Sequence, residues 1–380
     1  MAQNIAKSTS EVIGYGVLVT DEKGVIIGCN DEKRIGELHP PSIKVMQENR
    51  PMTTSTADAE NYRNILPGYT LPIQFFDRVL GSVSIAGLPE EVERYGLLVQ
   101  KQAEIMLREQ AFLESNLLRE RALRDLIENI SSYDPRKSSG ELIIMQANEL
   151  GFNISKCRIA IVIEMNKWSN EAAENAFQRM FREVRTSFSN PRNVICPQEN
   201  YRATILLSTS SDGGSEKIYE AAETLSKDFL DSVRAKGILA DVSIGFSAFD
   251  LQGLSRSINS AKNSLRLAKQ LGTKGIIRSE KFTGESLIDA LPSEVREDYV
   301  SMTLKGLPAR NDYDEIRDTF MAWCESPFAS GNVAEKLSMH RNSLQYRLKK
   351  IRALTGKDPW NFKDAFELWT AFVISDISKN

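Results

Sequence analysis

Residues 331–352 read GNVAEKLSMHRNSLQYRLKKIR, and this stretch decides how the carboxyl-terminal part of the chain folds. It begins with small and apolar residues at helical spacing, Val333, Ala334 and Leu337, which predict a short first helix. A tight turn at residues 338–339 follows, and a second helix then carries several basic side chains. A short helix, a turn and a polar second helix form the helix-turn-helix motif, whose second helix enters the major groove of DNA.

The second helix of this motif separates an apolar stripe from a polar face. Leu344, Leu348 and Ile351 recur at spacings of four and three and predict the buried side. The first turns of such a helix face base edges, where Arg, Asn and Gln can form paired hydrogen bonds with guanine or adenine. Basic residues further along are better placed for phosphates. The predicted DNA-binding residues are His340, Arg341, Asn342, Ser343, Gln345, Tyr346, Arg347, Lys349 and Lys350.

The positive charge around this helix is local. The chain holds 48 Lys and Arg against 51 Asp and Glu, whereas residues 331–357 hold seven basic residues and one acid. Phosphate binding needs such a cationic face rather than a basic protein. A solvated surface helix has similar charge, but the turn, apolar register and polar cluster together favour DNA binding. The next helix is expected to close the core with Trp360, Phe362, Phe366, Leu368 and Trp369.

Composition indicates a globular protein of two or three domains. The 380 residues are 41% hydrophobic and 26% charged. No apolar run approaches the roughly 20 residues that span a bilayer, and the first residues lack a signal-peptide pattern, so no membrane association is expected. The chain has two histidines and four scattered cysteines without a Cys-x-x-Cys pair. We therefore predict no disulfide framework, metal site or cofactor, and a reducing, cytoplasmic location.

The expected fold class is α+β and multidomain, and residues 1–90 form its first domain. Strand-forming residues at Ile13–Thr20 and Val25–Gly28 flank a turn, and a second pair of strands is expected at 71–76 and 79–86. A helical segment at Ser42–Asn49 lies between the two hairpins. An antiparallel sheet with helices over a small cavity is typical of a PAS-like sensor.

Residues 91–131 are predicted to form one long connecting helix. From about Glu90 to Ile130 there is no proline, and apolar pairs recur every seven residues before the phase shifts near Leu117. A helix of this length cannot bury its apolar stripe alone. Two solutions remain open: a dimeric coiled coil, or packing of the helix against the chain's own domains.

The segment Ser131–Gly140 is predicted to end the long helix and to act as a hinge. Residues 141–283 then alternate between strand and helix patterns in the order β-α-β-β-α-β-α-β, with the first helix of this series expected at Glu171–Phe188. This order implies one sheet with helices on one face. Residues 285–380 are expected to form a helical domain that contains the helix-turn-helix.

The stretch His340–Ile351, followed by Leu354-Thr355-Gly356 and Asp358-Pro359, resembles the PucR-type helix-turn-helix. Across nearly its whole length the chain resembles the bacterial carbohydrate (sugar) diacid regulators of the CdaR/SdaR type, with matching pieces at 13–15, 21–27, 34–39 and 71–73. The resemblance implies a transcription activator that responds to small sugar-derived acids such as glucarate, galactarate, glycerate or glycolate.

The middle part resembles the degenerate nucleotide-cyclase-like (GGDEF-like) domain of these regulators. An active cyclase of this kind has paired acids at the end of its first strand and a glycine pair in its hairpin. Here the strand ends in Glu164-Met165-Asn166, with an amide in place of one acid, and the hairpin reads Gln198–Arg202 without glycine. Two-metal chemistry on a triphosphate needs acidic ligands and close backbone approach. No catalytic residues and no enzymatic activity are therefore expected.

A small acid needs a fixed cation, hydrogen-bond donors and shelter from water. Arg34, Gly36 and His39 offer these on one short segment, because Arg grips a carboxylate with two hydrogen bonds and Gly permits close backbone approach. Gly68 and Thr70 are predicted to form the opposite wall, with the Thr70 hydroxyl as a ligand partner. The alternative is that Arg34 is a surface residue paired with an acid and that His39 caps a helix.

The sequence thus predicts a ligand-responsive transcription regulator whose partners are double-stranded DNA, a small organic acid and a second copy of the chain. A homodimer is expected because one recognition helix reads few base pairs. Two alternatives from other classes are a sensor-controlled nucleotide cyclase-like enzyme and a ligand-binding adaptor that does not bind DNA.

Overall fold

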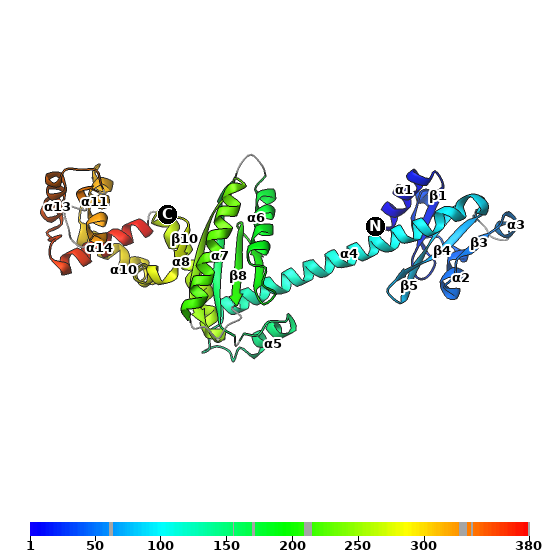
Figure 1. The fold of residues 1–380 in the computed structure, drawn as a ribbon, viewed down its shortest axis with the longest axis horizontal. Coiled ribbons are helices and arrows are strands. Elements are labelled where there is room, and N and C mark those ends of the chain that lie inside the picture. The colour runs from blue at the N-terminus through cyan, green and yellow to red at the C-terminus, as the bar shows by residue number, and fades with distance from the viewer. Residues whose placement is uncertain are drawn as a thin grey trace. The chain divides into compact units, whose positions relative to one another are not determined.

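The computed structural model describes residues 1–60, 64–154, 156–168, 172–208, 215–326, 333–335 and 337–378 (Figure 1). The chain divides into two compact units, Met1–Arg119 and Glu120–Asn380, and each is described by itself. Gly331, Asn332 and Lys336 of the helix-turn-helix stretch, and Glu171 at the start of a predicted helix, lie outside the described residues. No helix in the described ranges is both long enough and apolar enough to cross a membrane.

The first unit is built on an antiparallel sheet of five strands in the order β2-β1-β5-β4-β3. The strands are β1 (Gly16–Thr20), β2 (Ile26–Cys29), β3 (Met52–Thr54), β4 (Gly68–Phe75) and β5 (Arg78–Ala86). Both predicted hairpins form, and the Asp21 carboxylate closes the first by accepting hydrogen bonds from the Lys23 and Val25 amides at 2.9 Å. The first strand begins at Gly16 rather than Ile13, because residues 2–13 form a helix that ends at Gly14 with φ of 76°.

The helices of the first unit cover the two faces of this sheet differently. Helices α1 (Ala2–Ile13) and the start of α4 (Pro89–Ser131) pack on the apolar face, which carries Val17, Val83 and Ile85. The opposite face carries small polar residues at alternate positions and is approached by η1 (Glu32–Arg34) and α2 (Pro40–Glu48). A short helix, α3 (Thr56–Ala59), follows β3. The polar residues on that second face are Thr20, Thr70, Ser82 and Ser84.

Helix α4 was predicted at Glu90–Ile130 and forms at Pro89–Ser131. Its first turns bury Val92, Val99 and Ala103 in the first unit, and its last turns contribute to a core of the second. Packing against the chain's own domains therefore accounts for both ends of the helix. On the outer side of the first turns and between the two packed ends, large apolar side chains stay exposed in the single chain: Leu97, Leu98, Ile105, Phe112, Leu113, Leu117 and Leu118.

The second unit contains a five-stranded sheet in the order β10-β9-β6-β8-β7. Its strands are β6 (Arg158–Lys167), β7 (Val194–Gln198), β8 (Arg202–Ser208), β9 (Leu239–Ala248) and β10 (Ile276–Arg278). Neighbouring strands are antiparallel except β9 and β10, which are parallel and joined through α8 (Leu251–Gln270). The predicted hinge is confirmed as a break, since α4 ends at Ser131 and α5 (Glu141–Glu149) begins ten residues later.

The prediction that helices cover one face of this sheet is wrong. Ile159, Ile161 and Ile163 of β6 face α6 (Ala173–Ser187) and α7 (Ser215–Ala235), which lie side by side (Figure 1). Ala160 of the same strand faces the end of α4 and the first turns of α8, and Val162 packs with later residues of α8. The first eight residues of β6 are all buried, and the apolar run Ile159–Ile163 within them is the pattern of a strand covered on both faces.

The carboxyl-terminal part of this unit is helical, as predicted. A 3-10 turn, η2 (Ser279–Phe282), leads from β10 into its first helix, and a second, η3 (Leu307–Ala309), lies between α10 and α11. The main helices are α9 (Thr283–Asp289), α10 (Ser293–Leu304), α11 (Tyr313–Glu325), α13 (Arg341–Thr355) and α14 (Phe362–Ile377).

The aromatic residues predicted to close this core do so only in part. Leu368 is buried and Trp369 packs partly against the core, but Phe362 is 78% exposed, and Trp360 and Phe366 are also exposed. The prediction is therefore wrong for these three residues. Helix α14 turns Ala365, Leu368 and Phe372 inward at spacings of three and four, which places Phe362 and Phe366 on another side.

Candidate functional site

The first unit contains a small cavity, of about 130 Å³, on the polar face of its sheet. Arg34 and His39, both predicted to bind an acid, line it together. They reach it from η1 and from the residue that precedes α2. The other lining residues are Gly16, Val17, Leu18, Cys29, Asn30, Asp31, Leu66, Ser84 and Ala86.

The Arg34 guanidinium is held beside this cavity by few partners. One of its terminal nitrogens donates to the Asn64 carbonyl at 2.9 Å, and its Nε lies 3.6 Å from a Glu37 carboxylate oxygen. The pairing with Glu37 matches part of the alternative interpretation of Arg34. Nε is buried, however, and has no hydrogen-bond partner among the described residues. A buried N–H without an acceptor is costly, so this atom is a natural contact for a ligand oxygen.

His39 is only 3% exposed and lies directly before α2, whose first two residues are prolines. Its side chain makes no capping hydrogen bond; instead Nδ1 lies 2.7 Å from the Ser42 hydroxyl. Burial, together with the positive charge of Arg34, lowers the pKa of His39 to about 4. The imidazole is therefore neutral near pH 7, and Arg34 is the cationic side chain among the residues that line the cavity.

Three other predicted site residues do not line the cavity. Gly36 has a φ of 95° in the turn between η1 and His39, where its amide donates to Ile26. Gly68 lies where a Cβ would collide with the Ile85 carbonyl, so it permits β4 and β5 to approach. Thr70 is buried and donates to the Ser84 hydroxyl at 2.9 Å, and Ser84 lines the cavity in its place.

Sequence analysis missed Ser84, although the alternation in β5 carried a signal for it. Val83 and Ile85 face the apolar core, which places Ser82 and Ser84 on the opposite face. Asn30 and Asp31 were also missed as lining residues. Asn30 is already engaged, because its carbonyl oxygen accepts from the Val17 amide at 3.1 Å and its NH₂ group donates to Ser10. Asp31 caps η1 through the Lys33 amide.

The second candidate site is helix α13. Leu344, Leu348 and Ile351 are buried in a core that includes Ile316 and Phe320 of α11, so the predicted register is confirmed. His340 is the N-cap residue, and its Nδ1 accepts a hydrogen bond from the Asn342 amide at 3.2 Å. The predicted DNA-binding residues that lie exposed to solvent are His340, Arg341, Asn342, Ser343, Gln345, Tyr346 and Lys349.

The remaining two predicted DNA-binding residues are tied to α11 and its start. Arg347 donates to the Thr319 hydroxyl at 2.9 Å and pairs with Glu315 at 3.2 Å. Lys350 pairs with Asp312, and this hydrogen bond, with that of Arg310, lowers the pKa of Asp312 to about 2. These contacts brace α13 against its neighbour and leave the two cations less free to contact phosphate.

In the middle domain, Glu164 is the one acid that remains where an active cyclase has a pair, and two basic side chains bind it. Arg202 and Lys269 bind separate oxygens of the Glu164 carboxylate at 2.6 and 2.8 Å. Burial opposes ionisation of Glu164, but these two partners outweigh it and lower its pKa. Asn166, where a cyclase would have an acid, donates to Asp241 at 2.5 Å. Within the described ranges, no group of three His, Cys, Asp or Glu side chains is arranged to hold a metal ion.

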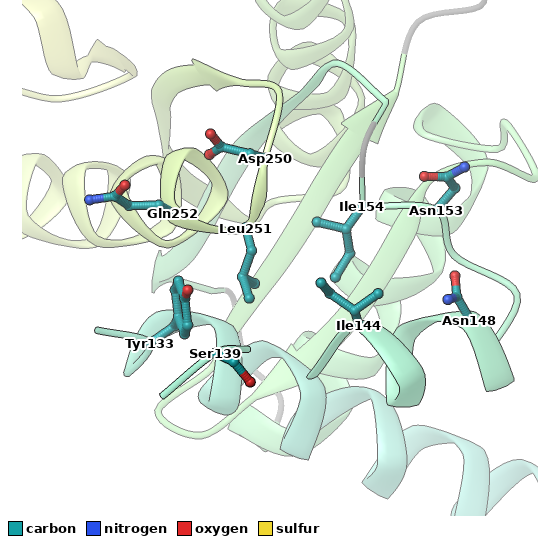
Figure 2. A pocket seen from close by; sticks show the side chains of 9 residues that line it. All are labelled: Tyr133, Ser139, Ile144, Asn148, Asn153, Ile154, Asp250, Leu251 and Gln252. Carbon is teal, nitrogen blue, oxygen red and sulfur yellow. The ribbon is translucent and has the colours of Figure 1, made fainter. Parts of the chain in front are cut away.

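A larger cavity of about 500 Å³ lies elsewhere in the second unit (Figure 2). Figure 2 shows side chains from the hinge, α5 and the start of α8 around it. The described residues that line it include no Lys, Arg or His, so it lacks a fixed cation for a carboxylate. They are Tyr133, Ser139, Ile144, Asn148, Asn153, Ile154, Asp250, Leu251 and Gln252.

Three family models match the chain in the predicted order. The putative sugar diacid recognition family matches residues 1–130, the GGDEF-like domain matches residues 135–267, and the PucR C-terminal helix-turn-helix domain matches residues 316–374. These matches confirm the resemblances to a sugar diacid sensor, to a cyclase-like middle domain and to the PucR-type motif.

Relatives match the chain over nearly its whole length. The carbohydrate diacid regulator of Escherichia coli (strain K12) is 25% identical over 379 residues, which cover 99% of this chain and 97% of that protein. An uncharacterized protein of Haemophilus influenzae is 24% identical over 93% of each chain, and YsfB of Bacillus subtilis is 22% identical over 99% of this chain and 97% of its own. Over nearly its whole length this chain is therefore similar to the carbohydrate diacid regulator of Escherichia coli, and its carboxyl-terminal part matches the PucR-type helix-turn-helix.

Proposed function

We propose that this chain is a cytoplasmic DNA-binding transcription activator that responds to a small sugar-derived acid such as glycerate, glycolate or glucarate. The observation that carries the proposal is the structure of α13. Its apolar side is buried against α11, and this packing holds outward a polar face with seven of the nine predicted DNA-binding side chains exposed. A rigid helix with such a face is suited to a duplex groove.

Each part of α13 has its own proposed role on DNA. Arg341, Asn342 and Gln345 lie in the first turns, where they would meet base edges and supply sequence specificity. Lys349, one turn further on and exposed, would contact a phosphate. Arg347 and Lys350 would act indirectly, by fixing the angle of α13 on α11 through Glu315 and Asp312.

The first unit would be a PAS-like sensor. An antiparallel five-stranded sheet with helices on both faces and a small cavity between sheet and helix supports that description. The cavity is smaller than the roughly 300–1,000 Å³ of sites for drug-sized ligands, so the effector would be a small molecule. Arg34 would bind its carboxylate, with His39 and Ser84 as further partners.

Helix α4 would carry the signal, because it starts in the core of the sensor and ends in a core of the second unit. An acid can shift the population of DNA-binding-competent chains only through different affinities for the two states. The exposed apolar residues of α4 support a homodimer in which a second copy covers them. Leu98, Ile105 and Phe112 follow the seven-residue spacing of helix pairs.

Dimerisation through α4 can be tested by charge substitution. Ile105→Glu with Phe112→Glu is expected to convert a dimer to a monomer in light-scattering measurements, because buried charges at such positions oppose association. Gln110→Glu is the matched control, since Gln110 is exposed and lies about 140° around the helix from Ile105. A wild-type monomer, or a dimer that survives the double substitution, would rule out this interface.

DNA binding is tested by fluorescence anisotropy with the chain's own upstream DNA, with and without glycerate, glycolate or glucarate. Asn342→Ala is expected to weaken specific binding by about 1–3 kcal/mol, because a two-point contact to a base is lost. Lys363→Ala, which truncates an exposed side chain of α14 outside the predicted DNA-binding residues, is the control for non-specific effects of truncation. Equal effects of the two substitutions would mean that Asn342 makes no base-specific contact, and no binding at all would leave a ligand-binding adaptor as the better description.

A cyclase-like enzyme is less well supported than the regulator. Glu164 is engaged by two cations, and Asn166 stands at the position of the second acid. Incubation of the chain with nucleoside triphosphate and magnesium tests this class directly. Formation of a cyclic nucleotide product would contradict the proposal that the middle domain is not catalytic.

A further inference from the structure

A row of buried hydroxyl groups leads from the sheet of the first unit to the imidazole of His39. The Thr20 and Ser82 hydroxyl oxygens lie 2.9 Å apart, Ser82 donates to the Ser42 hydroxyl oxygen at 2.6 Å, and Ser42 lies 2.7 Å from His39 Nδ1. All four side chains are at least 97% buried. The row joins β1, β5 and α2 to the wall of the cavity.

The direction of these hydrogen bonds follows from counting protons. The Ser82 hydroxyl donates its hydrogen bond to Ser42, so the Ser82 oxygen can accept one from the Thr20 hydroxyl. Ser42 already accepts from Ser82, and its own proton needs an acceptor. Among the described residues, the Ser42 hydroxyl has two hydrogen-bond partners, Ser82 and His39. Ser82 is the donor to Ser42, so His39 Nδ1 is the acceptor of the Ser42 proton. A neutral imidazole whose Nδ1 accepts must carry its proton on Nε2.

We propose that Thr20, Ser82 and Ser42 are positioning residues that fix His39 as the Nε2–H tautomer, so that the ring offers a donor to the cavity and the site selects an ionised carboxylate over a neutral amide of the same size. This inference rests on the proposed acid-sensing function. The low pKa of His39 agrees with it, because a neutral ring has two tautomers and its surroundings decide between them.

Two further groups make the cavity a site of donors. The Arg34 Nε is buried with no acceptor among the described residues. Ser84 accepts the proton of Thr70 at 2.9 Å, which leaves its own proton available to a ligand. Arg34, His39 and Ser84 thus offer N–H and O–H groups to an anion, whereas the other tautomer of His39 would place a lone pair opposite the carboxylate. An amide ligand would bring its own N–H groups against these donors.

Nitrogen-15 NMR of histidine-labelled full-length chain reads the tautomer directly. The chain has two histidines, so His340→Gln leaves the signal of His39 alone. At pH 7 we expect the Nε2–H tautomer in this background, a mixture of tautomers in Ser42→Ala, and recovery in Ser42→Thr. Thr20→Val, at the far end of the row, should shift the balance less. Thr54→Val is the matched control, because the Thr54 hydroxyl is buried without a hydrogen-bond partner in the described structure.

Ligand selection is measured by thermal shift with glycolate against glycolamide, and glycerate against glyceramide. We expect the acids alone to raise the melting temperature, and Ser42→Ala to weaken acid binding about fivefold, the loss of about one hydrogen bond. Circular dichroism checks that each variant is folded; if Ser42→Ala is not, Thr20→Val and Ser42→Thr carry the test.

The outcomes separate this inference from the effector proposal. Acid binding with His39 in the Nδ1–H tautomer, or with a tautomer unmoved by both Ser42→Ala and Thr20→Val, overturns the positioning row and leaves the effector site standing. The expected tautomer without binding of any acid overturns the effector site instead. Equal binding of glycolate and glycolamide overturns the selection for an anion.

Discussion

Two of the cavities in this protein, one in each unit, differ in volume and in the charge of the residues that line them. The cavity in the second unit (Figure 2) holds about 500 Å³, and the one in the first unit holds about 130 Å³. In the larger cavity, Asp250 caps α8, because one of its carboxylate oxygens accepts a hydrogen bond from the Gly253 amide at 2.6 Å. The lining residues Asn148 and Gln252 are neutral. In the smaller, Arg34 supplies a permanent positive charge and a buried Nε–H that has no hydrogen-bond acceptor among the described residues.

Of these two cavities, the smaller has the fixed charge and the buried donor that a carboxylate needs, although it has less room. A carboxylate entering the larger cavity would leave water without a cation to replace it, and would lie near the Asp250 carboxylate. Desolvation of an unpaired ion is costly, whereas a charged hydrogen bond contributes about 1.5–3 kcal/mol. The difference between the cavities can be tested through stability and through binding.

The largest expected difference is a pH dependence of the first unit. Burial and Arg34 lower the pKa of His39 from 6.5 to about 4, with Asp31 also on the cavity wall and Glu37 beside Arg34. Between these pH values the unfolded chain binds more protons than the folded one. The His39 contribution is therefore complete above pH 6.5 and is lost as the pH falls to about 4, an effect of about 3 kcal/mol on the free energy of unfolding.

Hydrogen exchange of the β1 and β5 amides in the full chain measures this loss. His39→Gln should flatten the dependence between pH 6.5 and 4, because the substituted side chain does not titrate. The second unit provides an internal reference, since all four tryptophans lie there and its histidine, His340, is exposed. An unchanged slope in His39→Gln would show that carboxyl groups, not the imidazole, govern the pH dependence of the first unit's stability.

Acid binding is the next largest difference. Arg34→Ala is expected to weaken glycerate or glycolate binding by about 2 kcal/mol, or about 30-fold, because a charged hydrogen bond to the carboxylate is lost. Arg34→Lys should recover part of the affinity but not the two-point geometry. Thermal shift or calorimetry measures the change.

Two controls assign that loss to one cavity. Arg50→Ala removes an exposed positive charge from the same unit, and Gln252→Ala alters the larger cavity. Neither should change the affinity. An acid-induced shift that persists in Arg34→Ala and disappears in Gln252→Ala would move the effector site to the second unit.

The sequence was most informative where neighbouring residues determine the structure. The turn at Asp21 predicts the first hairpin, and the apolar stripe of Leu344, Leu348 and Ile351 predicts the register of α13. Repeating apolar pairs between charged residues, without a proline from residue 90 to residue 130, predict α4. Arg34 and His39, which line the smaller cavity, were selected from the sequence because both lie on one short segment. In each case the physical cause is local, so a single sequence carries it.

The failures concern contacts between distant segments. Ser84 and Thr70 are neighbours across β4 and β5, and only the strand pairing shows which of them reaches the cavity. Gly36 and Gly68 were interpreted as ligand contacts, but turn geometry and strand approach explain them. Likewise, the apolar run in β6 signals burial without naming the helices on each face. Such outcomes depend on which strands pair, and no short pattern encodes that choice.

The smallest expected difference concerns Ser84 and Thr70. Ser84→Ala removes a donor from the cavity wall and should weaken acid binding by about 1 kcal/mol, whereas Thr70→Val leaves the Ser84 hydroxyl in place and should cost less. The double variant should match Ser84→Ala alone, because Thr70 acts through Ser84 and the effects of coupled residues do not add. Calorimetry on the three variants distinguishes these cases. A larger effect of Thr70→Val would mean that Thr70 itself reaches the ligand, and that the cavity opens toward β4 when the acid binds.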